Sequence, residues 1–98
     1  MTDRAEERAA VQAVLARLSA LAPGHSVEVR VPPHAAVQII AGPRHTRGTP
    51  AAVVEMDAGT LLALADGSLS WEAALAAGRV RASGERSDLR QLFPLPRL

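Results

Sequence analysis

Two arginines and a histidine, Arg44, His45 and Arg47, lie within the most polar and turn-rich stretch of the chain, residues 42–50. Loops supply a large share of binding residues, and guanidinium groups bind carboxylates and phosphates through charge-assisted hydrogen bonds. The stretch therefore offers a site for an anionic head group. The alternative is a solvated turn whose arginines pair with a nearby carboxylate such as that of Glu55 or of Asp57.

The three histidines of the chain do not have the spacing of a metal site. His25, His34 and His45 do not stand one helical turn from another histidine or a carboxylate on a predicted helix. A meeting of His34 with His45 across a hairpin would leave a metal or proton-transfer role open. The chain has no cysteine and no nucleophile-elbow, phosphate-loop or dinucleotide-binding glycine pattern. We therefore expect no enzyme activity, no metal and no cofactor, and a catalytic role stays open only through His45.

Charge and hydropathy exclude several classes of partner. The 98 residues carry 11 basic side chains, all of them arginine, and 10 acidic ones, for a net charge of +1. Because the two signs are interspersed, no basic stripe indicates a nucleic-acid partner. No apolar run approaches the roughly 18 to 20 residues of a membrane helix, and the charged start is unlike a secretory signal. We expect a single cytoplasmic domain, residues 1–98, without membrane insertion.

The N-terminal half predicts a helix followed by three strands. A capping-box pattern begins at Asp3, and residues 3–21 carry apolar side chains at helical spacing. Residues 26–31 alternate valine with polar residues, which is typical of a strand with one buried face. Residues 36–41 are predicted to pair with that strand as a hairpin, and the more continuously apolar residues 51–56 are predicted to form a more central strand. The apolar face of the helix comprises Val11, Val14, Leu15, Leu18, Leu21 and Ala22.

Two short helices are predicted after the third strand. Asp57 and Ser70 can each accept unpaired amide hydrogens at a helix start, which predicts helices over residues 58–66 and 71–77. A glycine follows each helix and supplies a left-handed stop.

The remaining segment predicts a strand, a helix and a tail. Residues 79–83 alternate arginine with apolar residues, so we expect a last strand with Val80 and Ala82 pointing inward. A C-terminal helix over residues 87–93 and a frayed, extended tail over residues 94–98 complete the order.

This order of elements resembles the C-terminal half of sterol carrier protein 2-like (SCP2-like) domains. In that family a helix, a glycine-bounded turn, an alanine-containing helix and a strand of glycine, basic, apolar and basic residues precede the last helix. Upstream, residues 23–33 and 42–57 look like the short "sterol carrier family" proteins of high-GC actinobacteria, so the likeness covers most of residues 21–92. The residues that carry it in the C-terminal half are Leu61, Leu64, Gly67, Leu69, Trp71, Ala74, Gly78, Arg79, Val80, Arg81, Gly84, Leu89 and Leu92.

The resemblance implies an α+β fold, with one small, mostly antiparallel sheet of four to five strands covered on one face by helices. Members of the wider family have five strands around an apolar tunnel for fatty acyl chains or sterols. Here only four strands are predicted, Ser68 stands where the family usually has a basic residue, and one Phe and one Trp supply few large side chains. The implied function is non-enzymatic binding or carriage of an apolar ligand such as a fatty acyl chain or a sterol-like lipid.

The predicted ligand site lies between the sheet and the helices, where apolar burial at about 25 cal/mol per Å² would drive binding. Trp71, in the first turn of its helix, is either a core anchor or a wall of this site. The other residues expected to line it are Val29, Val37, Ile39 and Val54 of the strands and Leu15, Leu18, Leu61, Leu64 and Leu75 of the helices, with Arg44, His45 and Arg47 at its mouth.

The alternative function is a small protein-interaction or dimerisation module with a packed core and no ligand, acting through an open sheet edge or the exposed side of the first helix. An empty pocket of roughly 300 Å³ would cost roughly 7 kcal/mol. A native domain has a total stability of only about 5 to 15 kcal/mol. The space between sheet and helices must therefore be filled by a ligand, shared across a homodimer, or collapsed.

Overall fold

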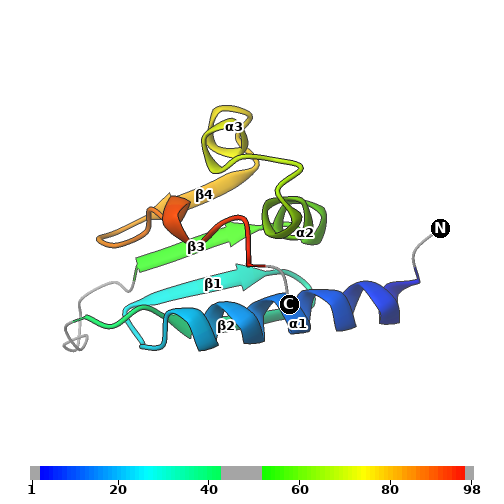
Figure 1. Ribbon diagram of the computed structural model, residues 1–98, viewed down its shortest axis with the longest axis horizontal. Coiled ribbons are helices and arrows are strands. Elements are labelled where there is room, and N and C mark those ends of the chain that lie inside the picture. The colour runs from blue at the N-terminus through cyan, green and yellow to red at the C-terminus, as the bar shows by residue number, and fades with distance from the viewer. Residues whose placement is uncertain (1–2, 43–51, 97–98) are drawn as a thin grey trace.

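A four-stranded sheet with helices on one face organises the chain (Figure 1). The computed structural model describes residues 3–42 and 52–96. The elements are α1 (Arg4–Leu21), β1 (Val27–Val31), β2 (Ala35–Ile39), β3 (Ala52–Met56), α2 (Ala58–Asp66), α3 (Trp71–Ala76), β4 (Val80–Ser83) and the 3₁₀ turn η1 (Arg90–Leu92).

The strand order is β2-β1-β3-β4. β1 pairs antiparallel with β2, as the hairpin prediction requires, and parallel with β3, while β3 and β4 are antiparallel. The α+β class and the mostly antiparallel sheet are confirmed, and β3 is an interior strand, as its apolar character predicts.

The alternation of side chains along β1 gives the sheet two different faces. Val27, Val29 and Val31 are completely buried, whereas Glu28 and Arg30 point to the other side. The register places Val29 opposite Val37 of β2 and Val54 of β3, so the apolar positions of adjacent strands fall on the same face. The helices cover that face, and the opposite face carries charged side chains.

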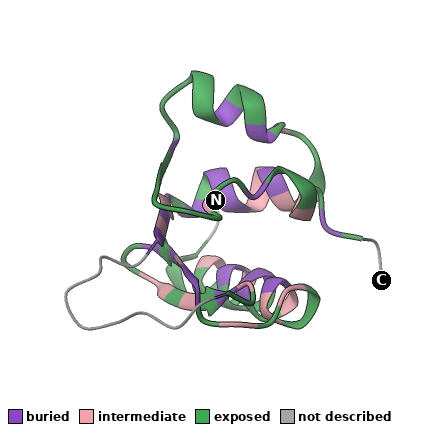
Figure 2. Ribbon diagram, turned by 90° about the vertical axis from the view of Figure 1, so that its left-hand side faces the viewer, coloured by how far each residue is buried: buried purple, intermediate pink, exposed green. Residues whose placement is uncertain are grey.

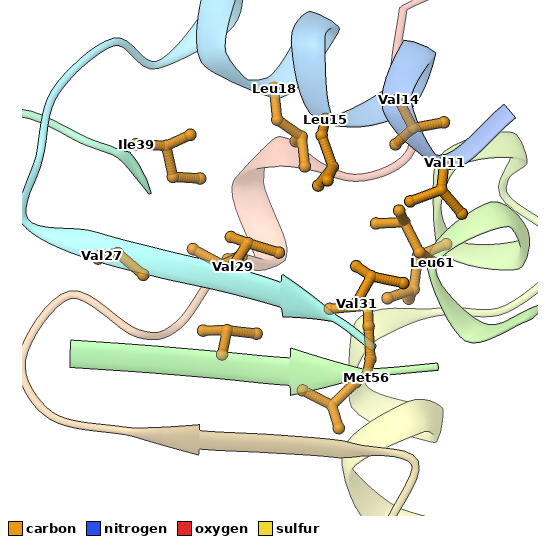
Figure 3. Packing of buried hydrophobic residues seen from close by; sticks show 14 of the residues in the cluster. Val11, Val14, Leu15, Leu18, Val27, Val29, Val31, Ile39, Met56 and Leu61 are labelled. Carbon is orange, nitrogen blue, oxygen red and sulfur yellow. The ribbon is translucent and has the colours of Figure 1, made fainter. Parts of the chain in front are cut away.

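Helix α1 packs on the inner face of β1 and β2. Asp3 caps it by accepting the backbone N–H of Ala5 at 3.1 Å. Its buried residues are Val11, Val14, Leu15 and Leu18, which face the valines of β1 (Figure 3). Leu21, predicted on the same face, is 48% exposed. At about 100° per residue, Leu21 falls at the margin of the buried stripe, so it lies beside the core and not within it.

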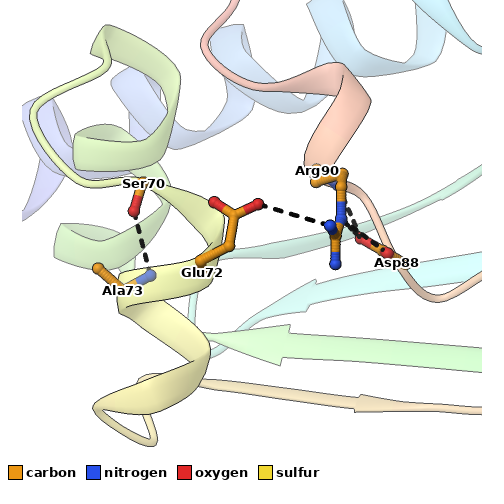
Figure 4. A network of polar contacts seen from close by, with 5 residues as sticks. All are labelled: Ser70, Glu72, Ala73, Asp88 and Arg90. Carbon is orange, nitrogen blue, oxygen red and sulfur yellow. Dashed lines mark hydrogen bonds and ion pairs between the residues drawn. The ribbon is translucent and has the colours of Figure 1, made fainter.

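Both capped helices of the second half are present. The Asp57 carboxylate accepts the backbone N–H of Thr60 at 2.8 Å, and Ser70 Oγ accepts that of Ala73 at 3.1 Å (Figure 4). Gly67 ends α2 with φ of +86°, in the left-handed region that glycine adopts without strain. These contacts are the caps that the sequence predicts.

The predicted C-terminal helix over residues 87–93 is wrong, because only the short turn η1 forms there. Ser87 Oγ donates to the carbonyl of Gly84, and the Asp88 carboxylate accepts the N–H of Arg90. These local side-chain bonds favour a turn over a helix, and Pro94 cannot continue one. Arg90 also lies between Asp88 and Glu72 of α3, which ties this turn to α3 (Figure 4).

The predicted frayed tail is also wrong for the part that the structure describes. Leu95 is 7% exposed, and its N–H donates to the carbonyl of Ala65 at 2.9 Å. Residues 97 and 98 lie outside the described residues. The segment after η1 is therefore packed on α2.

Ala82 does not point into the core as predicted. Val80 is buried, but Ala82 is exposed, although it pairs with buried Val54. β4 is an edge strand, and α3 packs only near its beginning (Figure 1). The far end of β4 therefore has no helix over it.

A side chain at Gly24 would collide with the backbone at the end of β2. An added Cβ would lie 2.2 Å from the carbonyl carbon of Ile40, and φ at Gly24 is +150°. In α2, by contrast, a Cβ at Gly59 would lie 3.7 Å from Asp57 Oδ1, an ordinary van der Waals contact. We expect Gly24→Ala to lower the free energy of unfolding by more than about 1 kcal/mol. Gly59→Ala should raise it by about 0.5 to 1 kcal/mol. Urea denaturation measures both changes, and equal effects of the two substitutions would contradict the packing at Gly24.

Asp57 makes the start of α2 sensitive to pH. Hydrogen bonds from Thr60, with a smaller contribution from the charge of Arg79, hold the pKa of Asp57 below its usual value. A depressed carboxyl pKa stabilises the fold above the unfolded-state value, near 3.8, and this contribution is lost as the pH falls through the lower folded-state value. Asn also caps helices well, so Asp57→Asn should keep most of the stability at pH 7 and flatten its decline below about pH 4. Urea titrations from pH 7 to pH 2 test this, and parallel curves for the two proteins would refute it.

Candidate functional site

The residues predicted to line a ligand site come together in one buried cluster. Leu15 of α1 is 3% exposed, and Leu18, Val29, Ile39, Val54, Leu61 and Leu64 are completely buried. Val37 of β2 is half-buried and packs against the cluster. The side chains of this cluster occupy the space between sheet and helices themselves (Figure 3).

Other predicted site residues lie apart from that cluster or outside the described part. Leu75 is 40% exposed on α3, a helix that is mostly solvent-exposed (Figure 2), so it does not face the space between sheet and helices. Arg44, His45 and Arg47 lie outside the described residues, and the predicted head-group site there stays a prediction.

Trp71 is an anchor between α3 and the C-terminal segment. It is 3% exposed, and its ring stacks on that of Phe93 with centroids 6.2 Å apart and an interplanar angle of 10°. Within residues 3–42 and 52–96, its buried indole Nε1 has no hydrogen-bond partner. The stack fixes the point from which residues 94–96 continue across α2 toward α1 (Figure 1).

A groove of about 680 Å³ lies between α1, α2 and the segment Pro94–Pro96. Two residues of α2, Leu62 and Ala65, form one side, and Val14 of α1 faces them. Leu95 and its flanking prolines form the third side, with the charged side chains of Arg17 and Asp66 also in the lining. The groove thus combines apolar side chains with a comparable polar surface, which includes one cation and one anion.

The C-terminal segment is held in place at both ends of this groove. Leu95 N–H donates to the Ala65 carbonyl, and the Arg17 guanidinium donates to the carbonyl of Pro96. The first contact satisfies a carbonyl in the last turn of α2, which has no partner within the helix. The second contact uses a donor group that is also suited to a carboxylate.

The two charged residues of the groove favour one orientation of an anionic ligand. Hydrogen bonds from Ser68 lower the pKa of Asp66, whose carboxylate accepts the Ser68 N–H at 2.8 Å. Asp66 is therefore ionised at neutral pH and repels a second carboxylate. An anionic head group is attracted instead to Arg17 on α1.

This groove was not predicted from the sequence. Arg17 falls outside the buried stripe of α1, and Leu62 and Ala65 are neighbours of Leu61 and Leu64, which were predicted to line a ligand site between sheet and helices. The run Phe93-Pro94-Leu95-Pro96 did contain a signal, because a large apolar residue between two prolines cannot be part of a helix and still needs a place to be buried.

The two histidines within the described residues each contact one side chain. His25 Nδ1 lies 3.1 Å from Gln38 Oε1, and His34 Nε2 lies 2.8 Å from Glu7 Oε2. The latter contact ties the β1–β2 turn to α1. Across residues 3–42 and 52–96, no group of three His, Cys, Asp or Glu side chains could hold a metal ion. The proposed meeting of His34 with His45 remains a prediction, because His45 is outside these ranges.

None of the helices in the described part of the chain has the length and apolar character needed to cross a lipid bilayer. This holds for α1, the longest of them, whose exposed side is charged.

Comparison with known proteins agrees with the fold. Residues 3–95 match the model of a protein family described as "Bacterial SCP ortholog", where SCP stands for sterol carrier protein. No curated protein matches the sequence closely enough to count as a relative. The family match runs from the N-cap of α1 to Leu95 in the groove, and so includes every helix and strand described above. The chain belongs to the family of bacterial sterol carrier protein orthologs.

Proposed function

We propose that this protein binds and carries a single apolar ligand with an anionic head, such as a fatty acid, in the groove between α1, α2 and the C-terminal segment. The observation that carries this proposal is the groove itself, which joins apolar walls to one guanidinium group. The family match supports the same class of function, since sterol carrier proteins are lipid carriers.

The size of the groove suits one acyl chain. Its volume of about 680 Å³ lies within the range of roughly 300 to 1,000 Å³ that is usual for small-ligand sites. Burial of each methylene contributes about 0.8 kcal/mol, so about ten methylenes contribute about 8 kcal/mol. Association itself costs an estimated 4 to 15 kcal/mol, which makes a medium or long chain necessary for useful affinity.

The buried cluster supports this groove from below. Leu15 and Leu18 are neighbours of Val14 on α1, and Leu61 and Leu64 are neighbours of the groove residues on α2. These four leucines keep α1 and α2 at a fixed separation. A ligand longer than the groove would have to displace their side chains, which is how the predicted site in the core would be reached.

A charged surface on the other side of the sheet makes an apolar dimer interface there less suitable. The outer face of β1 carries Glu28 and Arg30, and the register places Glu55 of β3 and Arg81 of β4 in the same row as Arg30. An interaction module would need an apolar patch for strong association. The charged row on the outer face does not provide such a patch.

Substitution of Leu62 tests the groove directly. Leu62→Gln should weaken binding of laurate roughly tenfold or more, because it removes a large apolar contact from the wall. Leu75→Gln is the matched control: the same substitution at a residue that is 40% exposed, outside the groove, should leave the affinity unchanged. Isothermal titration calorimetry gives both affinities. Absence of laurate binding in the wild-type protein, or equal affinities in both variants, would refute the proposal.

Substitution of Arg17 tests the orientation of the ligand. Arg17→Gln should weaken laurate binding about two- to fivefold, as expected for loss of a partly exposed ion pair. The loss should be smaller for 1-dodecanol, which has the same chain and no charge and is affected only through the contact of Arg17 with Pro96. Arg8→Gln, which removes one positive charge from an exposed position of the same helix, should affect neither ligand. Equal losses for laurate and 1-dodecanol would show that Arg17 does not contact the head group.

A further inference from the structure

A second groove, of about 420 Å³, lies at the opposite end of α2, where β3 enters that helix and the α3–β4 turn passes beside it. Its walls include Pro32, Met56 and Gly78, and its charged residues are Glu55, Asp57, Arg79 and Arg81. The two arginines belong to the Gly-Arg-Val-Arg run that begins β4, a motif that the lipid groove does not use.

Arg79 is held in a defined position. Its backbone N–H donates to the Ala74 carbonyl at 2.9 Å, and its side-chain Nε donates to Thr60 Oγ1 at 3.0 Å. Thr60 is completely buried, so it is a rigid anchor. A guanidinium group has five N–H donors, and the Thr60 contact uses one of them. In the described part of the chain, the donors on the two Nη atoms have no hydrogen-bond partner and can bind a ligand.

Arg79, which directly precedes β4, and Arg81 within that strand both line this groove. Val80 between them is buried in the core, and alternate residues of an extended chain face opposite directions. Two positions along a strand span about 6.6 Å. This spacing allows two guanidinium groups to hold a tetrahedral oxyanion between them, each as a two-pronged donor.

The groove holds two carboxylates beside its two arginines, and the charge of Arg79 contributes to the lowered pKa of Asp57. Asp57 is committed to the cap of α2, where it accepts the Thr60 N–H. Glu55 lies between Arg81 and Arg30 in the register of the three strands. In the part of the chain that the structure describes, the ion pairs do not involve Arg79 or Arg81.

We propose that Arg79 and Arg81 bind the phosphate group of a ligand in this groove, with Thr60 positioning Arg79. The site is separate from the lipid groove and does not depend on the function proposed there. A phosphate group can come from a small soluble phosphate ester or from the head group of a phospholipid, and both sources present the same oxygens to the two guanidinium groups.

Titration with sn-glycerol 3-phosphate at constant ionic strength, followed by ¹H–¹⁵N NMR, tests the proposal. We expect saturable shifts of the Arg79 and Arg81 Nε–H signals and of the backbone amides around Gly78. Arg81→Gln should weaken binding roughly tenfold. Arg81 has no hydrogen bond to a described side chain, so this variant should fold normally.

Two further variants sharpen the test. Glu55→Gln should strengthen binding, because it removes a negative charge from the groove, and Arg8→Gln on α1 should leave it unchanged. Shifts that do not saturate, equal shifts with sodium acetate, or equal affinity in Arg81→Gln would overturn the proposal. These results are independent of laurate binding, which Arg81→Gln should not alter.

Vesicles of phosphatidylcholine that contain phosphatidate distinguish the two sources of phosphate. Competition of these vesicles with glycerol phosphate, together with loss of vesicle binding in Arg81→Gln, would assign the site to a phospholipid head group. Binding of glycerol phosphate without competition from vesicles would assign it to a soluble ester.

Discussion

The contact between the buried face of α1 and the three valines of β1 determines where the other elements lie. Val27, Val29 and Val31 are completely buried, and the leucines of α1 cover them. Because side chains alternate along a strand, burial of these three valines assigns every neighbouring strand one inner and one outer face. α1 then stands beside α2, and the C-terminal segment closes the space that remains between the two helices.

Because the core is packed, a ligand site in this domain lies at the surface of the core and not within it. A tunnel through the core would leave the valines of β1 without contacts and would cost several kcal/mol of a small total stability. The chain instead fills its core with its own side chains. Leu95 is buried against α2, and the groove formed there lies at the surface of the packed domain. With its core filled in this way, the unliganded domain loses no stability to an internal cavity.

Local sequence patterns correctly predicted the helices and strands whose formation depends on neighbouring residues in the sequence. The strict alternation of β1 and the caps at Asp57 and Ser70 depend on neighbours in the sequence, and the structure has them as expected. The parallel pairing of β1 with β3 depends on contacts between distant residues, so no local pattern could indicate it. The prediction of a C-terminal helix was wrong because the side-chain hydrogen bonds of Ser87 and Asp88 stabilise a turn and compete with the backbone hydrogen bonds of a helix. The groove was not predicted because, like the pairing of β1 with β3, it depends on a contact between distant residues, here Leu95 and α2.

We propose that an acyl chain lies in the groove between α1, α2 and the C-terminal segment, with the core unchanged. Isotope-filtered NOE spectroscopy on the protein bound to unlabelled laurate tests it most directly, since it reports which methyl groups touch the chain. We expect NOEs from laurate to the methyl groups of Val14, Leu62 and Leu95. NOEs to Val29 and Val54 in their place would contradict it, because they would put the ligand between the sheet and the helices.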